Sequence, residues 1–213
     1  EYDDLQVSAL VGDVFRVGNA GEAVSQGVEV DGRWLLSDRL TIGASVAYLD
    51  AYYDDFSGAA CTIPQVSDPA NNPGCTRPDG TPIEPGETGG GQDLTDEDLL
   101  YSPDWSANFN AEYVAPIGDN LELRLNADIN YNDEFYSALD LDPNTEHDSA
   151  TKVNARIALA DVSDTWSIAL IGKNLTDETT AVWQNDVPTQ ASNSYFAVPE
   201  RPRSIAIQAR YRF

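Results

Sequence analysis

The sequence predicts an all-β fold, an antiparallel up-and-down β-barrel whose strands cross a membrane. Long segments alternate between apolar and polar residues, their connections alternate between short and long, and aromatic residues mark both ends of the apolar faces. Eight strands are expected, at residues 4–11, 23–35, 40–53, 100–115, 121–136, 150–160, 165–178 and 203–213.

The alternation is clearest in residues 121–136. Apolar residues from Leu121 to Tyr131 occupy one parity, and charged or amide residues from Glu122 to Asn132 occupy the other. Neighbouring side chains of a strand point to opposite faces of its sheet. The segments are also about twice as long as the usual soluble strand of about 5–6 residues. We therefore predict that the apolar face contacts lipid, while the charged face lines a wet lumen or contacts a polar plug.

The connections and the aromatic residues orient the predicted strands. Tight turns follow the second, fourth and sixth segments and longer loops follow the others, which is the pattern of short periplasmic turns and long extracellular loops. Aromatic residues near the short-turn ends are Trp34, Tyr113, Trp166, Tyr211 and Phe213. Aromatic residues toward the long-loop ends are Tyr48, Tyr52, Trp105 and Tyr131. Two such belts are expected where a barrel meets the two membrane interfaces.

Composition excludes some classes of function. The chain has 213 residues and a formal net charge of -24, so it repels phosphates and no nucleic-acid partner is expected. It has no apolar run of about 18 residues, which excludes a transmembrane helix but not a barrel. The sequence begins without methionine or a signal peptide, and we expect it to be a piece of a longer protein. No phosphate-binding glycine loop occurs, and we predict no cofactor.

Residues 55–98 form the longest predicted loop, rich in proline, glycine and acidic side chains. Its two cysteines, Cys61 and Cys75, lie within this one loop, which predicts a disulfide in an oxidising compartment. The alternative is two free thiols, and two thiols are too few ligands for a metal site. Simple solvation explains its acidic residues. The alternative is a calcium site built from clustered carboxylates. Those carboxylates would be Asp93, Asp96, Glu97 and Asp98.

Five stretches of the sequence resemble the C-terminal barrel strands of TonB-dependent outer-membrane receptors, in the order of that family. NAGEAVSQGVEV at 19–30 and the segment at 40–50, which ends in AYLD, resemble two successive strands. SPDWSAN at 102–108 resembles the strand after a long external loop. GKNLTDE at 172–178 and RPRSIAIQARYRF at 201–213 resemble the penultimate and terminal strands.

This resemblance implies a 22-stranded barrel with an N-terminal plug, of which residues 1–213 would be about the last eight strands. It implies uptake of a scarce nutrient such as a ferric siderophore, driven by the TonB complex through the missing N-terminal part. The implied surroundings are outer-membrane lipid and lipopolysaccharide. Tyr211 and Phe213 would belong to a terminal signal for the outer-membrane barrel assembly machinery. The long loop at 55–98 would be extracellular.

Candidate ligand contacts are aromatic residues near the long loops, because aromatic rings stack on planar or sugar-like ligands. They are Tyr53, Tyr136, Trp183 and Tyr195. The alternative is that these residues belong to the aromatic belt or pack the loops. The single histidine, His147, is expected in a solvated loop, and we predict no catalytic residue and no metal site. The alternatives for His147 are acyl transfer with Ser149 and an aspartate, or metal binding with Glu146 and Asp148.

Other classes of protein fit parts of the pattern. One is a self-contained eight-stranded outer-membrane barrel that acts as an adhesin, an anchor or, through His147, a hydrolase. Another is a soluble β-sandwich that binds a partner. The sequence does not separate siderophore, cobalamin, haem, saccharide and peptide as ligands of a receptor.

Overall fold

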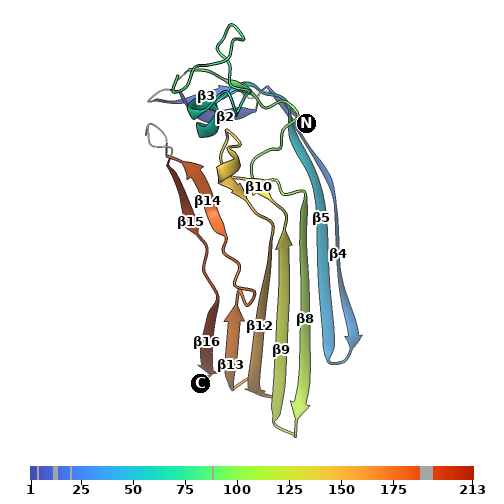
Figure 1. The fold of residues 1–213 in the computed structure, drawn as a ribbon. Helices are drawn as coiled ribbons and strands as arrows, with labels where there is room; N and C mark the ends of the chain where they lie inside the picture. Colours follow the sequence, from blue (N-terminus) through green and yellow to red (C-terminus); the bar gives the residue numbers. More distant parts are fainter. Residues whose placement is uncertain (4, 12–13, 20, 88, 188–193) are drawn as a thin grey trace.

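The structure, a computed structural model, describes residues 1–3, 5–11, 14–19, 21–87, 89–187 and 194–213. Within these residues, eight strands form one antiparallel sheet in which each strand pairs with the next sheet strand along the chain (Figure 1). They are β1 (Tyr2–Asp3), β4 (Glu22–Ser37), β5 (Leu40–Asp55), β8 (Trp105–Ile117), β9 (Leu121–Asn132), β12 (Ala150–Asp161), β13 (Trp166–Lys173) and β16 (Ser204–Tyr211). This up-and-down order confirms the predicted fold class. The sheet is open in the described part of the chain, because β1 and β16 stand at its two ends.

The register carries both predicted faces across the sheet. One row of paired residues is apolar from β4 to β16: Trp34, Ile42, Ala111, Ala127, Ala155, Gly172 and Ile205. A row of the other parity is polar: Asp31, Ser45, Asn108, Asn130 and Lys152. We call the first the apolar face and the second the polar face. Since directly opposed residues share a face, the parity predicted for single segments holds over the whole sheet.

The apolar face is uncovered. Val30 is 66% exposed, Ile157 51% and Ile207 79%, and the ribbon has no second sheet over the long strands (Figure 1). Isolated apolar residues are normal on a soluble surface, but a continuous apolar face of this extent is not. The β-sandwich considered from the sequence is therefore wrong. No helix among the described residues is long and apolar enough to cross a membrane.

Short turns join the long strands at one end, as predicted. Between β4 and β5, the Ser37 hydroxyl accepts hydrogen bonds from the Arg39 and Leu40 amides at 3.2 and 3.1 Å. The turn from β8 to β9 contains Gly118 at φ +63, a conformation that glycine adopts without strain. The turn from β12 to β13 places Asp164 at φ 56, a value that aspartate tolerates better than most residues.

The long loops at the other end contain secondary structure of their own. Four two-stranded sheets lie there within the described residues: β2 (Gln6–Val11) with β3 (Val14–Asn19), β6 (Ser57–Ala59) with β7 (Gln92–Asp93), β10 (Phe135–Tyr136) with β11 (Glu146–His147), and β14 (Ala181–Asp186) with β15 (Tyr195–Pro199). Two helical turns accompany them, α1 (Ile63–Ser67) and η1 (Pro143–Thr145). A capping box formed by Thr62 and Gln65 begins α1. These segments gather above the long strands (Figure 1).

The first predicted strand is the largest error of the sequence analysis. Only Tyr2 and Asp3 pair with β4, while most of the predicted segment 4–11 forms β2 and pairs with β3 instead; residue 4 lies outside the described residues. The reason is that the apolar side chains of this segment pack against the loops and not on the sheet. Leu5 and Val7 pack against the loop core rather than on the apolar face.

Two other predicted strands end earlier than expected. The segment at 121–136 divides into β9 and the separate β10. The segment at 165–178 ends at Lys173, because Asn174 turns the chain at φ 50. The buried Asn174 amide closes that turn by donating to the Glu178 carbonyl at 2.9 Å and accepting from the Glu178 amide at 3.0 Å. The motif GKNLTDE is therefore a strand end followed by a side-chain-closed turn.

The hydrophobic core lies among the loops and not between layers of sheet. Its buried members are Tyr53, Phe56, Ala59, Leu94 and Leu141. Partly buried residues packed against them are Leu5, Val7, Leu99, Leu100, Tyr136 and Leu139. The ring centroids of Tyr53 and Phe56 are 4.8 Å apart. This loop core ties the upper end of β5 to three separate loops.

Candidate functional site

The loops above the long strands form the candidate site, and Asp142 lies at their centre. Its carboxylate is fully buried. It accepts hydrogen bonds from the Ile63 amide at 3.2 Å, the Tyr195 hydroxyl at 2.9 Å and the Asn144 amide at 2.9 Å. These donors come from the start of α1, from β15 and from η1. One carboxylate therefore joins three segments that are far apart in the sequence, and its donors compensate for its burial.

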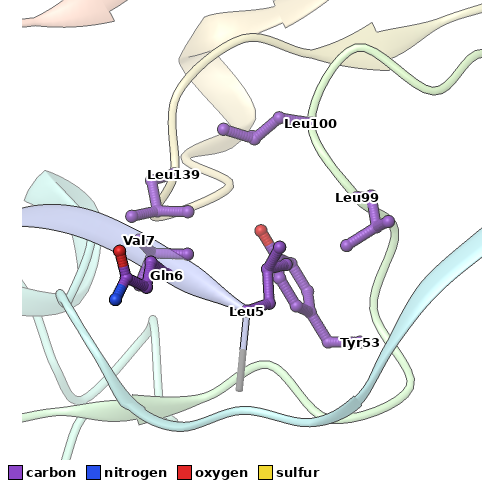
Figure 2. Close-up of a pocket in the computed structure, with 7 residues that line it drawn as sticks. All are labelled: Leu5, Gln6, Val7, Tyr53, Leu99, Leu100 and Leu139. Carbon is purple, nitrogen blue, oxygen red and sulfur yellow. The ribbon is translucent and has the colours of Figure 1, made fainter. Parts of the chain in front are cut away.

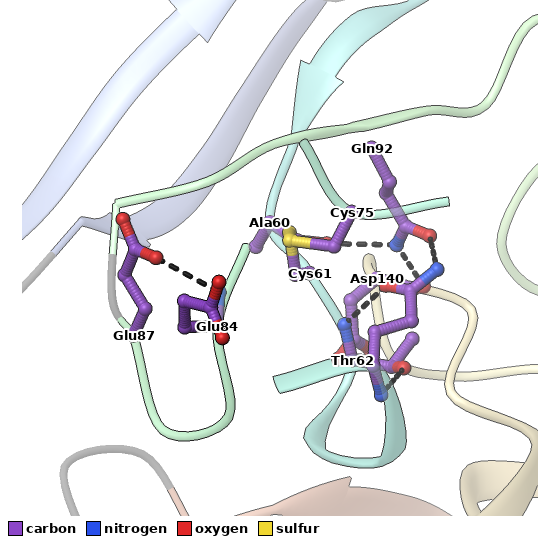
Figure 3. The surroundings of a disulfide bond; sticks show 9 residues. Ala60, Cys61, Thr62, Cys75, Glu84, Glu87, Gln92 and Asp140 are labelled. Carbon is purple, nitrogen blue, oxygen red and sulfur yellow. Dashed lines mark hydrogen bonds between the residues drawn. A yellow bond between two sulfur atoms is a disulfide. The ribbon is translucent and has the colours of Figure 1, made fainter. Parts of the chain in front are cut away.

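Gln92 forms a second junction between loops. Its side-chain amide donates to the carbonyls of Ala60 at 2.7 Å and Asp140 at 2.6 Å, and its side-chain oxygen accepts from Gln65 at 2.9 Å (Figure 3). Because Gln92 is buried, all these polar groups need partners, and they satisfy one another. Neither Asp142 nor Gln92 was singled out from the sequence. The only local signal was Asp142 before Pro143, a common start for a helical turn.

A disulfide between Cys61 and Cys75 lies beside this junction, as the sequence predicts. Their Cα atoms are 5.6 Å apart, a usual separation for this bond. One glycine of this loop has a packing role here. A Cβ at Gly90 would come within 2.7 Å of the Cys75 sulfur, so this backbone can lie against the disulfide only without a side chain.

His147 is buried and does not lie in a solvated loop as expected. Its Nε2 lies 2.8 Å from the Ser137 hydroxyl, and its ring stacks on Phe135 with centroids 4.4 Å apart. Burial lowers the pKa of His147. Ser137 donates to the Gln184 carbonyl at 2.7 Å and accepts from the Gln184 amide at 3.0 Å. These contacts join β10, β11 and β14, which is a packing role for the histidine.

The acyl-transfer alternative for His147 lacks its partners. The hydroxyl at His147 belongs to Ser137 and not to Ser149, and it is buried and already bonded to the backbone of β14. A nucleophile needs access to substrate and a base that is oriented by a third group. The described residues contain no group of three or more histidine, cysteine, aspartate or glutamate side chains that could hold a metal ion.

Two further acids adjoin the Asp142 junction, the buried Asp140 and the half-buried Asp186. Burial, together with the charges of Asp186 and Asp142, raises the pKa of Asp140 to about 7. Burial also raises the pKa of Asp186, again with a contribution from Asp142. Tyr195 has a raised pKa because of its burial and its hydrogen bond to Asp142. The loop junction therefore concentrates negative charge in a place with little water.

An apolar pocket of about 370 Å³ opens in the loop core. Figure 2 shows its walls, which come from the start of β2, the end of β5 and two loops. Its lining residues are Leu5, Gln6, Val7, Tyr53, Leu99, Leu100 and Leu139. The Tyr53 ring forms one wall, and its hydroxyl points into the space between the leucines (Figure 2).

The four predicted ligand-contact residues fall into three environments. Tyr53 is 2% exposed and lines the pocket, and Tyr136 packs against the same core. Tyr195 is tied through its hydroxyl to Asp142. Trp183 is 39% exposed on β14 and contacts Phe196 edge-on, with ring centroids 4.9 Å apart. The structure therefore brings Tyr53 and Tyr136 together and holds Trp183 apart from them.

The polar face carries a separate ionic cluster near the short turns. Asp164 accepts from Arg124 at 3.2 Å, Arg212 at 3.0 Å and Arg210 at 3.4 Å, and Arg124 also pairs with Glu122. The cluster links β9, the turn after β12 and the end of the chain. Charged side chains that pair across strands are expected on a wetted wall and would be costly against lipid.

The open, two-faced sheet with short turns at one end and elaborate loops at the other defines the wall of an outer-membrane type of β-barrel. The model of the TonB dependent receptor-like, beta-barrel family matches residues 1–175. The chain belongs to this family, as the five sequence stretches indicated. No curated protein matches the chain.

Solved receptors share the fold at low sequence identity. The siderophore receptor PiuA from Acinetobacter baumannii aligns with a TM-score of 0.59 and 17% identity over 96% of this chain and 24% of its own. The ferric yersiniabactin uptake receptor FyuA from Yersinia pestis aligns with a TM-score of 0.64 and 14% identity over 99% of this chain and 26% of its own. The ferric preacinetobactin receptor BauA from Acinetobacter baumannii gives 0.54 and 14%, over 96% of this chain and 25% of its own. The chain spans about a quarter of these receptors.

Proposed function

We propose that the chain is part of an outer-membrane receptor that takes up a scarce nutrient by TonB-dependent transport, with a ferric siderophore as its ligand. Membership of the receptor family supports the receptor role. The solved structures that resemble the chain are named as a siderophore receptor, a ferric yersiniabactin uptake receptor and a ferric preacinetobactin receptor, which supports the ligand class. In this role residues 1–213 supply barrel wall and loops, and no residue performs covalent chemistry.

The observation that carries the proposal is the pair of continuous faces on one sheet. The apolar face is uncovered from Val30 to Ile207, while the polar face forms hydrogen-bond ladders across strands. Asn108 of β8 donates across the strands to Asn130 of β9 at 2.8 Å, and Asn130 donates along β9 to Asp128 at 2.9 Å. A wall with lipid on one side and a wetted passage on the other requires this division.

The loops are the part of the proposal that concerns the ligand. Residues 55–98 are proposed to lie outside the cell and, with the two later loops, to close over the passage. Tyr136, Trp183 and Tyr195 are the proposed contacts at this mouth. Their loops are held in one arrangement by Asp142, Gln92 and the disulfide, which reduces the conformational entropy lost when a ligand binds.

The proposal for transport is tested by iron uptake. Bacteria that carry the receptor containing this chain are given a panel of ferric siderophores with radioactive iron. Uptake of at least one member should fall to background when the receptor gene is removed, and equally when TonB is removed. Normal uptake of every siderophore without the receptor would contradict the ligand class. Uptake that depends on the receptor but not on TonB would contradict the energy source.

The self-contained eight-stranded barrel is less well supported. The β1 and β16 edges are unpaired with each other in the described residues. An exposed sheet edge invites aggregation, and membrane-spanning barrels remove it by closure. An adhesin or anchor would therefore need a rearrangement of these edges, whereas a larger barrel covers them with further strands.

A further inference from the structure

Tyr53 presents its hydroxyl to the pocket in the loop core. The residue stands at the end of β5 and is 2% exposed. Its hydroxyl forms no hydrogen bond with any described residue. Figure 2 shows this oxygen directed toward Leu100 and the space beside Leu139. The oxygen faces the open space of the pocket and can therefore bond to a group that enters it, a capacity that phenylalanine would lack.

The pocket that receives this hydroxyl has the size of a small-molecule site. Its volume of about 370 Å³ falls in the range of about 300–1,000 Å³ that ligand pockets occupy. A cavity of about 150 Å³ already accommodates benzene. Aliphatic side chains form most of the wall, and Gln6 stands at its edge. An aromatic ring or a short branched acyl chain fits this chemistry, and a bare polar solute does not.

We propose that this pocket is a subsite for the aromatic or acyl group of a small molecule, with a carbonyl oxygen of the same group accepting a hydrogen bond from Tyr53. The inference rests on the proposed receptor function, because it names the part of the ligand that this chain contacts. The leucines supply contact area, and Tyr53 supplies orientation. A few polar groups in an apolar pocket generally provide specificity in this way.

Charges at the edge of the pocket select against an anionic ligand. The acidic turn at Asp96 and Glu97 is fixed to Tyr53 itself, since the Tyr53 amide donates to the Glu97 carbonyl at 2.9 Å and the Asp96 amide donates to the Tyr53 carbonyl at 2.8 Å. Burial raises the pKa of the adjacent Asp98, and the charges of Asp104 and Glu97 add to the shift. The group that enters the pocket should therefore be neutral or cationic.

Photolabelling with benzophenone tests the site. Benzophenone is neutral and aromatic, carries a carbonyl acceptor and couples to nearby C–H bonds on irradiation. The complete receptor is reconstituted in lipid nanodiscs without an energy source, irradiated with benzophenone and mapped by mass spectrometry. Labels are expected on Leu139, on Leu99 and Leu100, and on residues 5–7. Its carboxylated analogue, benzoylbenzoate, should label these residues about tenfold less.

Variants distinguish labelling that requires the pocket from nonspecific binding of the probe. Leu139→Trp and Leu99→Trp fill the pocket and should reduce labelling of the remaining wall about tenfold. Tyr53→Phe keeps the shape of the pocket and should reduce labelling of its wall about fivefold. Leu36→Trp, on an exposed leucine of β4 far from the loops, is the matched control and should leave labelling unchanged. If a tryptophan variant does not fold, the Tyr53→Phe comparison still decides.

The outcomes distinguish the pocket from the receptor function. Labels that are absent from the wall, or equal for wild type, Tyr53→Phe and the folded tryptophan variants, would overturn the subsite. Labelling needs neither TonB nor transport, so siderophore uptake that stays normal after removal of the receptor would contradict the function and leave the pocket result standing. Siderophore uptake that depends on the receptor, in the absence of pocket labelling, would contradict only the proposed subsite.

Discussion

At the scale of single residues, Asp142 explains how three loops hold one arrangement. A buried carboxylate is costly unless donors surround it, and no basic side chain pairs with Asp142 in the described structure. The donors are a backbone amide, a tyrosine hydroxyl and a neighbouring asparagine. Because the Tyr195 hydroxyl donates its hydrogen bond to Asp142, the ring of Tyr195 is the part that can contact a ligand.

We expect Asp142→Ala to loosen the loops without unfolding the sheet. Removing the carboxylate leaves the Ile63 amide and the Tyr195 O–H without an acceptor, at a cost of about 1–3 kcal/mol for each group. Hydrogen exchange should become faster at α1 and β15 and stay unchanged in β9. Asp79→Ala is the control, because Asp79 is exposed and bonds only within its own turn. Equal exchange at α1 in wild type and Asp142→Ala would contradict the role.

Asp140 should make the loop packing sensitive to pH. Its pKa rises from 3.8 to about 7 in the folded loops, so the folded state binds the proton more tightly than the unfolded state. Stability is then greatest below about pH 4 and declines as the pH rises toward 7, by at most about 4 kcal/mol. Limited proteolysis of the loops should therefore be slower at pH 5 than at pH 8.

Asp140→Asn is the matched comparison for this effect. The amide has no charge to lose, so the ratio of wild-type to variant cleavage rates should increase about tenfold or more between pH 5 and pH 8. Measuring the ratio at each pH cancels the pH dependence of the protease. A constant ratio would mean that Asp140 does not titrate in this range.

At the scale of elements, the disulfide and α1 form one unit of the longest loop. The bond joins Cys61 to Cys75 across a sequence separation of 14. The enclosed segment supplies the Ile63 amide to Asp142 and the Gln65 side chain to Gln92. Closing a loop of this length restricts the unfolded chain and stabilises the folded loop by about 3 kcal/mol.

Reduction of the disulfide, or the double change Cys61→Ser and Cys75→Ser, should release α1. Hydrogen exchange at residues 62–67 should increase by about two orders of magnitude, in proportion to the lost stabilisation. Amides of β8 and β9 serve as the internal control, since their pairing does not involve this loop. Unchanged protection at α1 would show that Asp142 and Gln92 hold the loop without the covalent bond.

Elements that repeat a pattern could be predicted from the sequence, and elements that depend on one distant contact could not. The parity of β9 runs over twelve residues and each residue supports the same assignment. The pairing of residues 4–11 depends instead on whether Leu5 packs on the apolar face or against the loop core, and periodicity does not distinguish the two. The Gln92 junction has no sequence signal, because its partners Ala60 and Asp140 contribute only backbone carbonyls.

At the scale of the whole molecule, the net charge of -24 is distributed unevenly between the two faces of the sheet and between its short-turn and loop ends. Arginines gather on the polar face near the short turns around Asp164, and acidic residues dominate the loops. Charged groups are thus kept from the apolar face between the aromatic belts. The contact of Tyr48 with Trp105, at 4.9 Å between ring centroids, marks the upper belt.

Adjacent residues of β5 test which face meets lipid. Ala44 lies on the apolar face opposite Gly32 and Phe109, midway between the belts, and Ser45 lies on the polar face opposite Asp31 and Asn108. Ala44→Arg should lower the free energy of unfolding in lipid vesicles by about 2–4 kcal/mol, because an arginine at the bilayer midplane is poorly solvated. Urea titrations measure the difference.

Ser45→Arg adds the same side chain one residue away and serves as the control. Its guanidinium would face water and the Asp31 carboxylate, so the free energy of unfolding should change by less than about 1 kcal/mol. Both variants introduce the same bulk and charge into the same strand, which leaves the environment of each face as the main difference. Equal losses would place both faces in similar surroundings, and a larger loss for Ser45→Arg would reverse the assignment of lipid and passage.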